Sequence, residues 1–229
     1  YQAGKEITTG SYNNIIGSQC GLNITSGTRN QIIGYKSGQN LTTGANNVII
    51  GNESGKQITT GEKNIAIGDE SIIGTGSVTG NNNTAIGYQS SNRISTGTDN
   101  VSVGYQAGYR VTTGIQNICI GSRAGNTSGT DLNTGSNNIL IGYQAGASTS
   151  SVSNEITLGD TNITKFRIPG INFVVKDTTA TDNYVLTVDA NGEAGWEAAA
   201  GGGGTEIVNN DLDDTRAGNG SNTNGYNIL

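Results

Sequence analysis

Aliphatic and polar residues recur in a fixed order along the first two-thirds of the chain. The stretch from Ile58 to Gly68 holds an aliphatic residue, Thr-Thr-Gly, two variable residues, Asn and then Ile-Ala-Ile-Gly. Successive Ile-Gly glycines are 17, 17, 17, 19, 17, 17 and 21 residues apart, whereas each Thr-Gly glycine precedes its Ile-Gly partner by seven residues. The length therefore varies at only one corner of the repeat. This pattern predicts an all-β fold, a parallel β-solenoid or β-roll of 17-residue coils.

Each repeat is expected to contain two extended pieces. In the longer piece, a period of two puts Ile65 and Ile67 on one face, which we assign to the core, and Ala66 on the other. The shorter piece is the aliphatic residue before Thr-Thr-Gly, such as Ile58, which also points inward. Because one coil cannot bury its apolar face alone, neighbouring coils must stack on it.

An asparagine lies four residues before every Ile-Gly glycine. Such regularity predicts a structural ladder, in which side-chain amides bond corner backbone groups of the adjacent coil. A ligand-binding row is the alternative. The predicted ladder consists of Asn13, Asn30, Asn47, Asn64, Asn83, Asn100, Asn117 and Asn138.

The middle residue of the longer piece is apolar or small in every repeat. On the assignment above these residues would form an exposed stripe, and such stripes usually mark a protein interface. We therefore predict a homotrimer, intertwined or side by side, that buries this row around a shared axis. The predicted interface consists of Ile15, Ile32, Ile49, Ala66, Ala85, Ser102, Cys119 and Leu140.

A tyrosine follows the Ile-Gly step in half of the repeats. These rings could contact a sugar, or they could pack against a neighbouring coil or subunit, which we favour. The residues are Tyr35, Tyr88, Tyr105 and Tyr143. The two longer corners, 69–80 and 122–135, are expected to bulge outward, either for recognition or through neutral drift.

The composition changes after residue 159, which predicts three parts: a solenoid shaft (1–159), a β-hairpin module (160–200), and a Gly-rich linker with a polar segment (201–229). Strands are expected at 163–168 and 171–175, around a Pro-Gly turn. A second hairpin is expected from Tyr184 to Trp196, around an Asn-Gly turn. The chain starts in mid-repeat, so we expect it to be a piece of a longer protein.

Charge and composition exclude several classes of function. The net charge of −6 argues against nucleic-acid binding, and no apolar run approaches the roughly 20 residues of a membrane span. The chain contains no His, which excludes Ser-His or Cys-His catalysis, and its carboxylates are scattered. Glu53 and Glu70 are interpreted as a solvated corner row. We therefore expect no enzyme, no cofactor and no metal, although a calcium loop within 205–229 is an alternative. Cys20 and Cys119 are too far apart for a disulfide.

The unit Asn-x-Ile-Ala-Ile-Gly-Tyr-Gln-(Ser/Ala)-Gly resembles the head repeat of trimeric autotransporter adhesins. It is still more similar to Ile-Gly-Tyr-Gln-Ala-Gly … Thr-Thr-Gly arrays in tail fibres of bacteriophages and fibre-like proteins of large viruses. The 17-residue period and the Thr-Thr-Gly corner depart from the adhesin pattern, and the run Leu186–Trp196 also resembles a tail-fibre hairpin. The resemblance covers roughly residues 1–159.

This resemblance implies a left-handed trimeric β-roll that is displayed at a surface and used for attachment. We expect a structural virion fibre, on a phage tail or a capsid, that acts as a rigid spacer at the virion surface. Its expected partners are other virion proteins on its N-terminal side and a host cell-surface glycan or protein. A bacterial trimeric adhesin head is one alternative. An ice-binding β-solenoid is another, but the threonine row is interrupted at Val78, Ser95 and Asn133.

Overall fold

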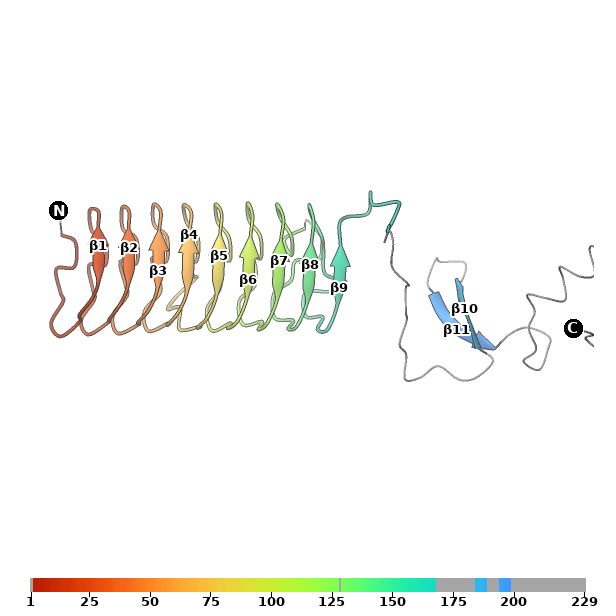
Figure 1. The fold of residues 1–229 in the computed structure, drawn as a ribbon, viewed down its shortest axis with the longest axis horizontal. Coiled ribbons are helices and arrows are strands. Elements are labelled where there is room, and N and C mark those ends of the chain that lie inside the picture. The colour runs from red at the N-terminus through yellow and green to blue at the C-terminus, as the bar shows by residue number, and fades with distance from the viewer. Residues whose placement is uncertain (1, 128, 168–183, 189–193, 199–229) are drawn as a thin grey trace, which may run out of the picture. The chain divides into compact units, whose positions relative to one another are not determined.

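The computed structural model describes residues 2–127, 129–167, 184–188 and 194–198, the last two ranges as backbone only. It divides into two units, Tyr1–Phe166 and Arg167–Leu229. In the first unit nine short parallel strands form one sheet in sequence order, one strand from each coil of a β-solenoid (Figure 1). The strands are β1 (Asn14–Ile16), β2 (Gln31–Ile33), β3 (Val48–Ile50), β4 (Ile65–Ile67), β5 (Thr84–Ile86), β6 (Val101–Val103), β7 (Ile118–Ile120), β8 (Ile139–Ile141) and β9 (Ile156–Leu158).

The fixed period sets the register of this sheet. Ile32 pairs with Ile49 and Ile49 pairs with Ala66, so each residue lies beside its equivalent in the next coil. Parallel strands need a crossover connection, which the remainder of each coil supplies as turns and bends. The second predicted extended piece is not a strand in the described residues. It contributes an isolated bridge, between Ile58 and Val78.

The core contradicts the predicted orientation of the strands. The middle residues of the strands, predicted to form the trimer interface, lie inside the coils instead, and from Ile32 to Leu140 they are at most 2% exposed. We call them the core row: Ile15, Ile32, Ile49, Ala66, Ala85, Ser102, Cys119 and Leu140. They share the interior with the aliphatic residues before Thr-Thr-Gly, including Ile24, Leu41 and Ile58. The flanking residues Ile65 and Ile67, predicted to be core, face outward and are only partly buried.

The asparagine ladder explains this reversal. Residues two apart in a strand share a face, so the middle residue must point the same way as the asparagine that precedes the strand. Asn64 is fully buried, and Ala66 therefore points inward with it. The amide needs interior hydrogen-bond partners, whereas an isoleucine is tolerated on either face. Consequently the polar residue, and not the isoleucines, decides which face is inside.

Glycine is required at one corner because the core row fills the space beside it. Gly38 has a φ of +54°, and a Cβ added there would lie 3.2 Å from side-chain atoms of both Ile32 and Ile49. The equivalent positions in two later coils hold Ile72 (φ +48°) and Ser91 (φ +46°), and both side chains are buried. In those coils the core row is small, from Ala66 to Ser102, which leaves room for a side chain at the corner.

The second unit is described only by two strands. β10 (Tyr184–Val188) and β11 (Ala194–Ala198) pair antiparallel, with Leu186 opposite Trp196. The Asn-Gly turn predicted between them lies outside the described residues, as do the Pro-Gly turn, the strand predicted at 171–175 and the segment 201–229. The strand predicted at 163–168 is wrong for its described residues, since 163–167 form no strand. The first unit extends beyond the predicted boundary at 159, to Phe166.

Candidate functional site

The asparagines form a continuous hydrogen-bonded ladder along the solenoid. The Nδ2 of Asn47 donates to the Oδ1 of Asn30 at 3.0 Å and to the carbonyl of Gly61 at 2.9 Å. The Oδ1 of Asn47 accepts in turn from the backbone N–H of Asn64 at 2.9 Å. Equivalent bonds to the neighbouring ladder residues run from Asn13 to Asn138. Because these amide groups are engaged within the chain, the ladder is a structural element and offers no free row of ligand contacts.

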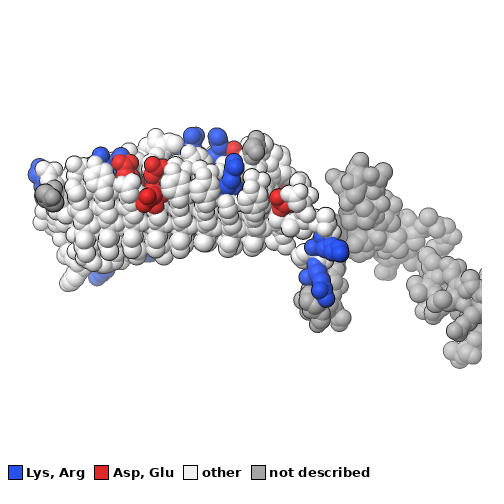
Figure 2. Space-filling view, turned by 90° about the horizontal axis from the view of Figure 1, so that it is seen from above, with Lys and Arg blue, Asp and Glu red and all other residues white. Residues whose placement is uncertain are grey.

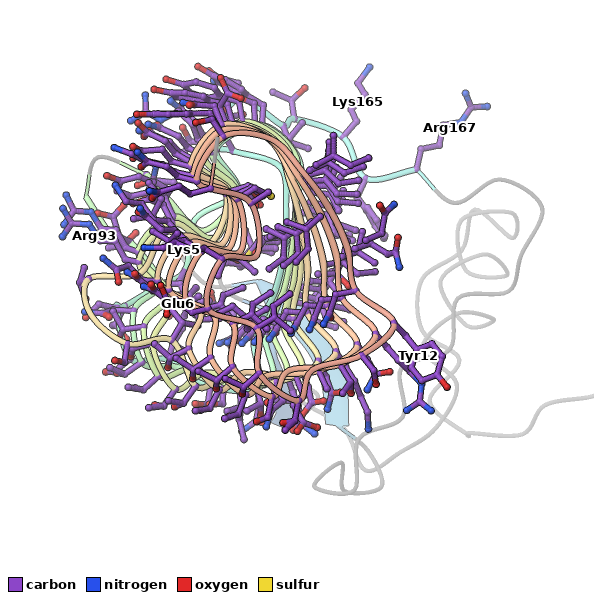
Figure 3. All side chains as sticks on the ribbon, turned by 90° about the vertical axis from the view of Figure 1, so that its left-hand side faces the viewer. Lys5, Glu6, Tyr12, Arg93, Lys165 and Arg167 are labelled. Atoms are coloured by element: carbon purple, nitrogen blue, oxygen red, sulfur yellow. The ribbon has the colours of Figure 1, made fainter. Side chains whose placement is uncertain are left out.

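The outward side of the sheet is almost entirely aliphatic. We define the outer sheet face as the first and last residues of strands β1–β9. Its polar members are Asn14, Gln31 and Thr84, and every other member is Ile, Val or Leu. Seen along the solenoid axis, side chains from successive coils superimpose into rows that point inward or outward (Figure 3). The face stays substantially exposed in the isolated chain, with Ile86 at 38% and Ile16 at 55%.

The signal for this face was present in the sequence but was assigned to the wrong residues. An apolar stripe along the axis requires one exposed strand face. The alternation offers two such faces, one made of the middle residues of the strands and one made of the flanking residues. The flanking residues such as Ile65 and Ile67 are predicted to be core, although in Val48–Ile50 both faces are equally apolar. The burial of the asparagines decides in favour of these isoleucines as the exposed set.

Charged residues lie elsewhere on the solenoid. In Figure 2 most of the visible Lys, Arg, Asp and Glu side chains of the solenoid gather along one long edge. Glu53 contacts two lysines, Lys56 at 3.0 Å and Lys36 at 3.9 Å. The Oε2 of Glu70 accepts instead from the side chain of Gln89, at 2.6 Å. The two carboxylates thus have separate partners, as expected of a surface row and not of a catalytic pair.

The tyrosine row is exposed, and two of its rings meet. Tyr35, Tyr88, Tyr105 and Tyr143 are between 44% and 59% exposed. Tyr88 and Tyr105 stack with centroids 5.6 Å apart and planes 13° apart, while Lys36 lies over the ring of Tyr35 at 5.0 Å. Partial desolvation, followed by the nearby Glu70 carboxylate, raises the pKa of Tyr88. Stacking covers one face of each ring in the pair, so these tyrosines pack against the neighbouring coil and leave less surface for a sugar.

The Thr-Thr-Gly corner contains two rows with different roles. The first hydroxyl of each pair bonds to the next coil, as when Thr42 Oγ1 donates to the carbonyl of Thr59 at 3.0 Å. The second hydroxyl points to solvent. We call these exposed residues the hydroxyl row: Thr9, Ser26, Thr43, Thr60, Thr79, Thr96, Thr113 and Thr134. The interruptions at Val78, Ser95 and Asn133 fall in the first row, so they leave the hydroxyl row unbroken.

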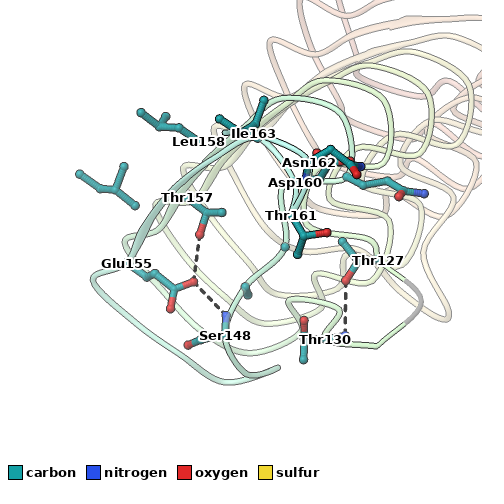
Figure 4. Close-up of a pocket in the computed structure, with 15 residues that line it drawn as sticks. Thr127, Thr130, Ser148, Glu155, Thr157, Leu158, Asp160, Thr161, Asn162 and Ile163 are labelled. Carbon is teal, nitrogen blue, oxygen red and sulfur yellow. Dashed lines mark hydrogen bonds between the residues drawn. The ribbon is translucent and has the colours of Figure 1, made fainter. Parts of the chain in front are cut away.

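An open groove of about 720 Å³ lies at the C-terminal end of the solenoid (Figure 4). Its acidic residue Glu155 accepts hydrogen bonds from the backbone N–H of Ser148 at 2.9 Å and from the hydroxyl of Thr157 at 3.2 Å. Burial acts to raise the pKa of Glu155, but these hydrogen bonds outweigh it and lower the pKa. The other carboxylate of the groove, Asp160, bonds to the nearby Asn162. Both acids are engaged locally, and they form no paired acid and base.

The longer corners extend only partly into solvent. In 69–80 the residues 75–77 are exposed, whereas Ser71 and Ile72 are buried. In 122–135 the exposed part includes residues 129 and 130. The carboxylate of Asp131 forms an ion pair with Arg110, whose Nε lies 2.8 Å from it. Part of each longer corner therefore packs against the core, and part of it reaches solvent.

The cysteines are free and buried. Burial raises the pKa of Cys20 to about 11 and that of Cys119 to about 12. The Sγ of Cys20 donates to the carbonyl of Ile32, where Ser37 and Ser54 make the same bond one and two coils later. Cys20 therefore acts as a small structural residue in a row of serines.

The described part of the chain contains no cluster of three or more His, Cys, Asp or Glu side chains close enough to hold a metal ion. Nor does this part contain a helix with the length and hydropathy that crossing a membrane requires.

The surface features that remain are the outer sheet face, the tyrosine row beside it and the hydroxyl row. All three are arrays that run along the solenoid. No protein-family model, curated protein or solved structure matches this chain.

Proposed function

We propose that this chain is a rigid shaft segment of a homotrimeric virion fibre that serves host attachment. The observation that carries the proposal is the uncharged aliphatic outer sheet face, which runs along all nine strands of a continuously hydrogen-bonded solenoid. Such a face is costly to leave in water, and side-by-side assembly of identical chains would cover it along its whole length.

Stiffness is the second support for a spacer role. The coils are joined by the parallel sheet, by the asparagine ladder and by the hydroxyl bonds of the Thr-Thr-Gly corner. At about 4.8 Å for each coil, the nine strands span roughly 38 Å. Longer fibres follow from adding coils, because each coil contacts only its neighbours.

The resemblance of the repeats to tail fibres of bacteriophages and large viruses supplies the biological setting. In this setting the protein is displayed at the virion surface, other virion proteins anchor it, and a glycan or protein of the host cell is the target. The tyrosine row and the tips of the longer corners are the exposed candidates for that contact. No catalytic step is required of a shaft.

Solution mass and localisation test the proposal together. Light scattering should give three times the chain mass of 23.4 kDa, about 70 kDa. Antibodies against the solenoid should label fibres that project from virions and should reduce adsorption to host cells. A monomer in solution would overturn the trimer. Labelling of a bacterial cell surface, with none on virions, would favour the adhesin alternative.

The hydroxyl row keeps ice binding as a second candidate. Eight Thr or Ser side chains recur once per coil without interruption, which is the regularity that a crystal lattice would need. A thermal-hysteresis measurement decides this point. Activity that is lost in Thr60→Lys and Thr96→Lys, but not when the outer sheet face is changed, would establish it, and no activity would exclude it.

A further inference from the structure

Three arginines lie on three successive coils, on a part of the surface that the outer sheet face does not include. We call these arginines, with the polar side chains between them, the arginine patch: Arg93, Gln106, Tyr109, Arg110, Arg123 and Asn126. The guanidinium of Arg93 lies over the ring of Tyr109, 5.5 Å from its centroid. Arg110 follows Tyr109 directly in the chain, so two of the arginines flank one ring.

The third arginine joins this group through the next coil. The period of 17 residues makes Arg123 the equivalent of Gln106 and Asn126 the equivalent of Tyr109, and equivalent residues of these coils lie side by side. The Nδ2 of Asn126 also donates to the Oε1 of Gln106 at 3.5 Å. From the coil of Arg93 to that of Arg123 there are two coil steps, about 10 Å. The patch is therefore compact and continuous.

The arginine patch carries positive charge that its acidic neighbour neutralises only in part. The Nε of Arg110 lies 2.8 Å from the carboxylate of Asp131, which holds this guanidinium in place. Among the described residues, neither Arg93 nor Arg123 forms an ion pair, and the Nε of Arg123 is buried without a hydrogen-bond partner. Two guanidinium groups thus have no acidic partner in this part of the chain.

The chemistry of these side chains matches an anionic sugar. Guanidinium groups form charge-assisted and often bidentate hydrogen bonds with anionic oxygen groups. The amides of Gln106 and Asn126 and the phenol of Tyr109 supply donors and acceptors for hydroxyl groups. We propose that the arginine patch binds a sugar with one carboxylate or sulfate group at the end of a host-cell glycan. This proposal rests on the proposed attachment function, and it adds a contact site and a ligand class.

The surroundings of the patch limit the length of an anionic ligand. Partial desolvation raises the pKa of Tyr88, and the charges of Glu70 and Asp69 raise it further, so both carboxylates lie near this ring. They belong to the coil before that of Arg93. A long polyanion that followed the solenoid would meet these like charges, which repel it. A single terminal sugar avoids them.

The patch stays open when the outer sheet face is covered. Seen along the solenoid axis, Arg93 lies on the side of the coils opposite to Tyr12, which is two residues before β1 (Figure 3). A trimer that buries the outer sheet face therefore presents one arginine patch from each chain. Several weak sites on one fibre would raise the overall avidity for a cell surface.

Binding of matched oligosaccharides tests the ligand class. Sialyllactose carries one carboxylate, sulfated lactose carries one sulfate, and lactose carries neither, and each is titrated into the full chain and followed by NMR. We expect an anionic sugar to bind, more weakly as the salt concentration rises, and lactose to show no binding. Binding of only one anionic sugar would support the site and identify its anionic group. Failure of both to bind, or equal binding of lactose, would overturn the proposal.

Paired charge removals test the location. The double variant Arg93→Gln and Arg123→Gln should weaken binding about tenfold, because two ion pairs with the ligand are lost. The control Lys36→Gln and Lys56→Gln removes the same charge from lysines that already contact Glu53, and it should bind like the parent protein. Both variants should keep the parent far-UV spectrum. Unchanged binding in the arginine variant, or an equal loss in the control, would overturn the site.

A nucleic acid is the competing ligand for arginine and tyrosine side chains. Tighter binding of a single-stranded oligothymidylate than of sialyllactose would overturn the sugar and identify this competitor. Neither result alters the solution mass or the labelling of virions. A failure of the arginine patch is therefore distinguishable from a failure of the proposed fibre.

Discussion

The hydroxyl of Ser91 donates a hydrogen bond to the hydroxyl of Ser102 across 2.8 Å, inside the solenoid. Ser91 occupies the corner that is glycine in most coils, and Ser102 occupies the core row, which is isoleucine in the first coils. The two positions compete for one volume. A corner glycine accompanies the isoleucines of the first coils, and the two corner side chains accompany small core residues. The converse does not hold, because the small residue Ser102 also lies beside the corner glycine Gly108.

This competition predicts a compensating pair of substitutions. Ser102→Ile alone should destabilise the fold by about 1–3 kcal/mol, because the Ser91 side chain already occupies the space. Adding Ser91→Gly should recover much of this loss, since it recreates the Gly38–Ile49 combination of an earlier coil. Denaturant unfolding of both single variants and the double variant gives the coupling energy. Strictly additive effects would contradict the shared volume.

Truncating two neighbouring residues of one strand should change the unfolding free energy by very different amounts. Ile49 is fully buried, so Ile49→Ala should cost about 2–5 kcal/mol of unfolding free energy. The adjacent Ile50 faces outward, so the unfolding free energy of monomeric Ile50→Ala should lie within about 0.5 kcal/mol of that of the monomeric parent protein. Chemical denaturation at a concentration where both variants are monomeric measures the difference. The reverse order would restore the strand orientation predicted from sequence.

Removing one amide from the ladder should weaken the connection of its coil to the following coil. The Nδ2 of Asn64 donates to the carbonyl of Gly80, and its Oδ1 accepts from Asn83. We expect Asn64→Ala to lower the unfolding free energy by about 1–3 kcal/mol, because buried partners lose their bonds. The exposed neighbour supplies the control, Lys63→Ala. Equal melting temperatures for the two variants would show that the ladder contributes no stability.

The two thiols should be unreactive toward thiol reagents in the native protein. With pKa values of about 11 and 12 and buried side chains, Cys20 and Cys119 should not react with a thiol reagent at pH 8, and both should react in denaturant. Because the folded pKa is raised, the associated stability is complete below the ordinary value of 9.0 and is lost as the pH rises toward about 11. Cys20→Ser should reduce this alkaline loss. Rapid native labelling would contradict the burial of either thiol.

Acid should selectively weaken the end of the solenoid through Glu155. Its pKa is lowered in the folded chain, so its contribution is present above the ordinary value of 4.5 and is lost as the pH falls through the folded value. The variant Glu155→Gln should therefore be less stable than the parent protein at pH 7. The difference between them should shrink below pH 4.5, which thermal unfolding across pH would measure. If the stability difference between Glu155→Gln and the parent protein did not depend on pH, it would arise from packing and not from the charge of Glu155.

The sequence by itself determined the repeat, the register and the ladder. A constant period places every residue beside its equivalent in the next coil, so Asn47 must lie next to Asn30 and Asn64 once the coils stack. The same reasoning identified the aliphatic residue before Thr-Thr-Gly as core and the two cysteines as unpaired. These conclusions need only the spacing, because contacts between identical positions do not depend on which way the strand faces.

Only the tertiary structure decided which strand face is inside. Both faces are apolar in Val48–Ile50, so hydropathy could not choose between Ile49 and its neighbours. The choice was made by Asn47, whose amide must reach carbonyls in the interior and which shares its face with Ile49. The corner exchange at Ile72 and Ser91 was likewise invisible, because it depends on the volume left by core-row residues of the same coil and the next one. Long-range packing and buried hydrogen bonds therefore settled what the local pattern left open.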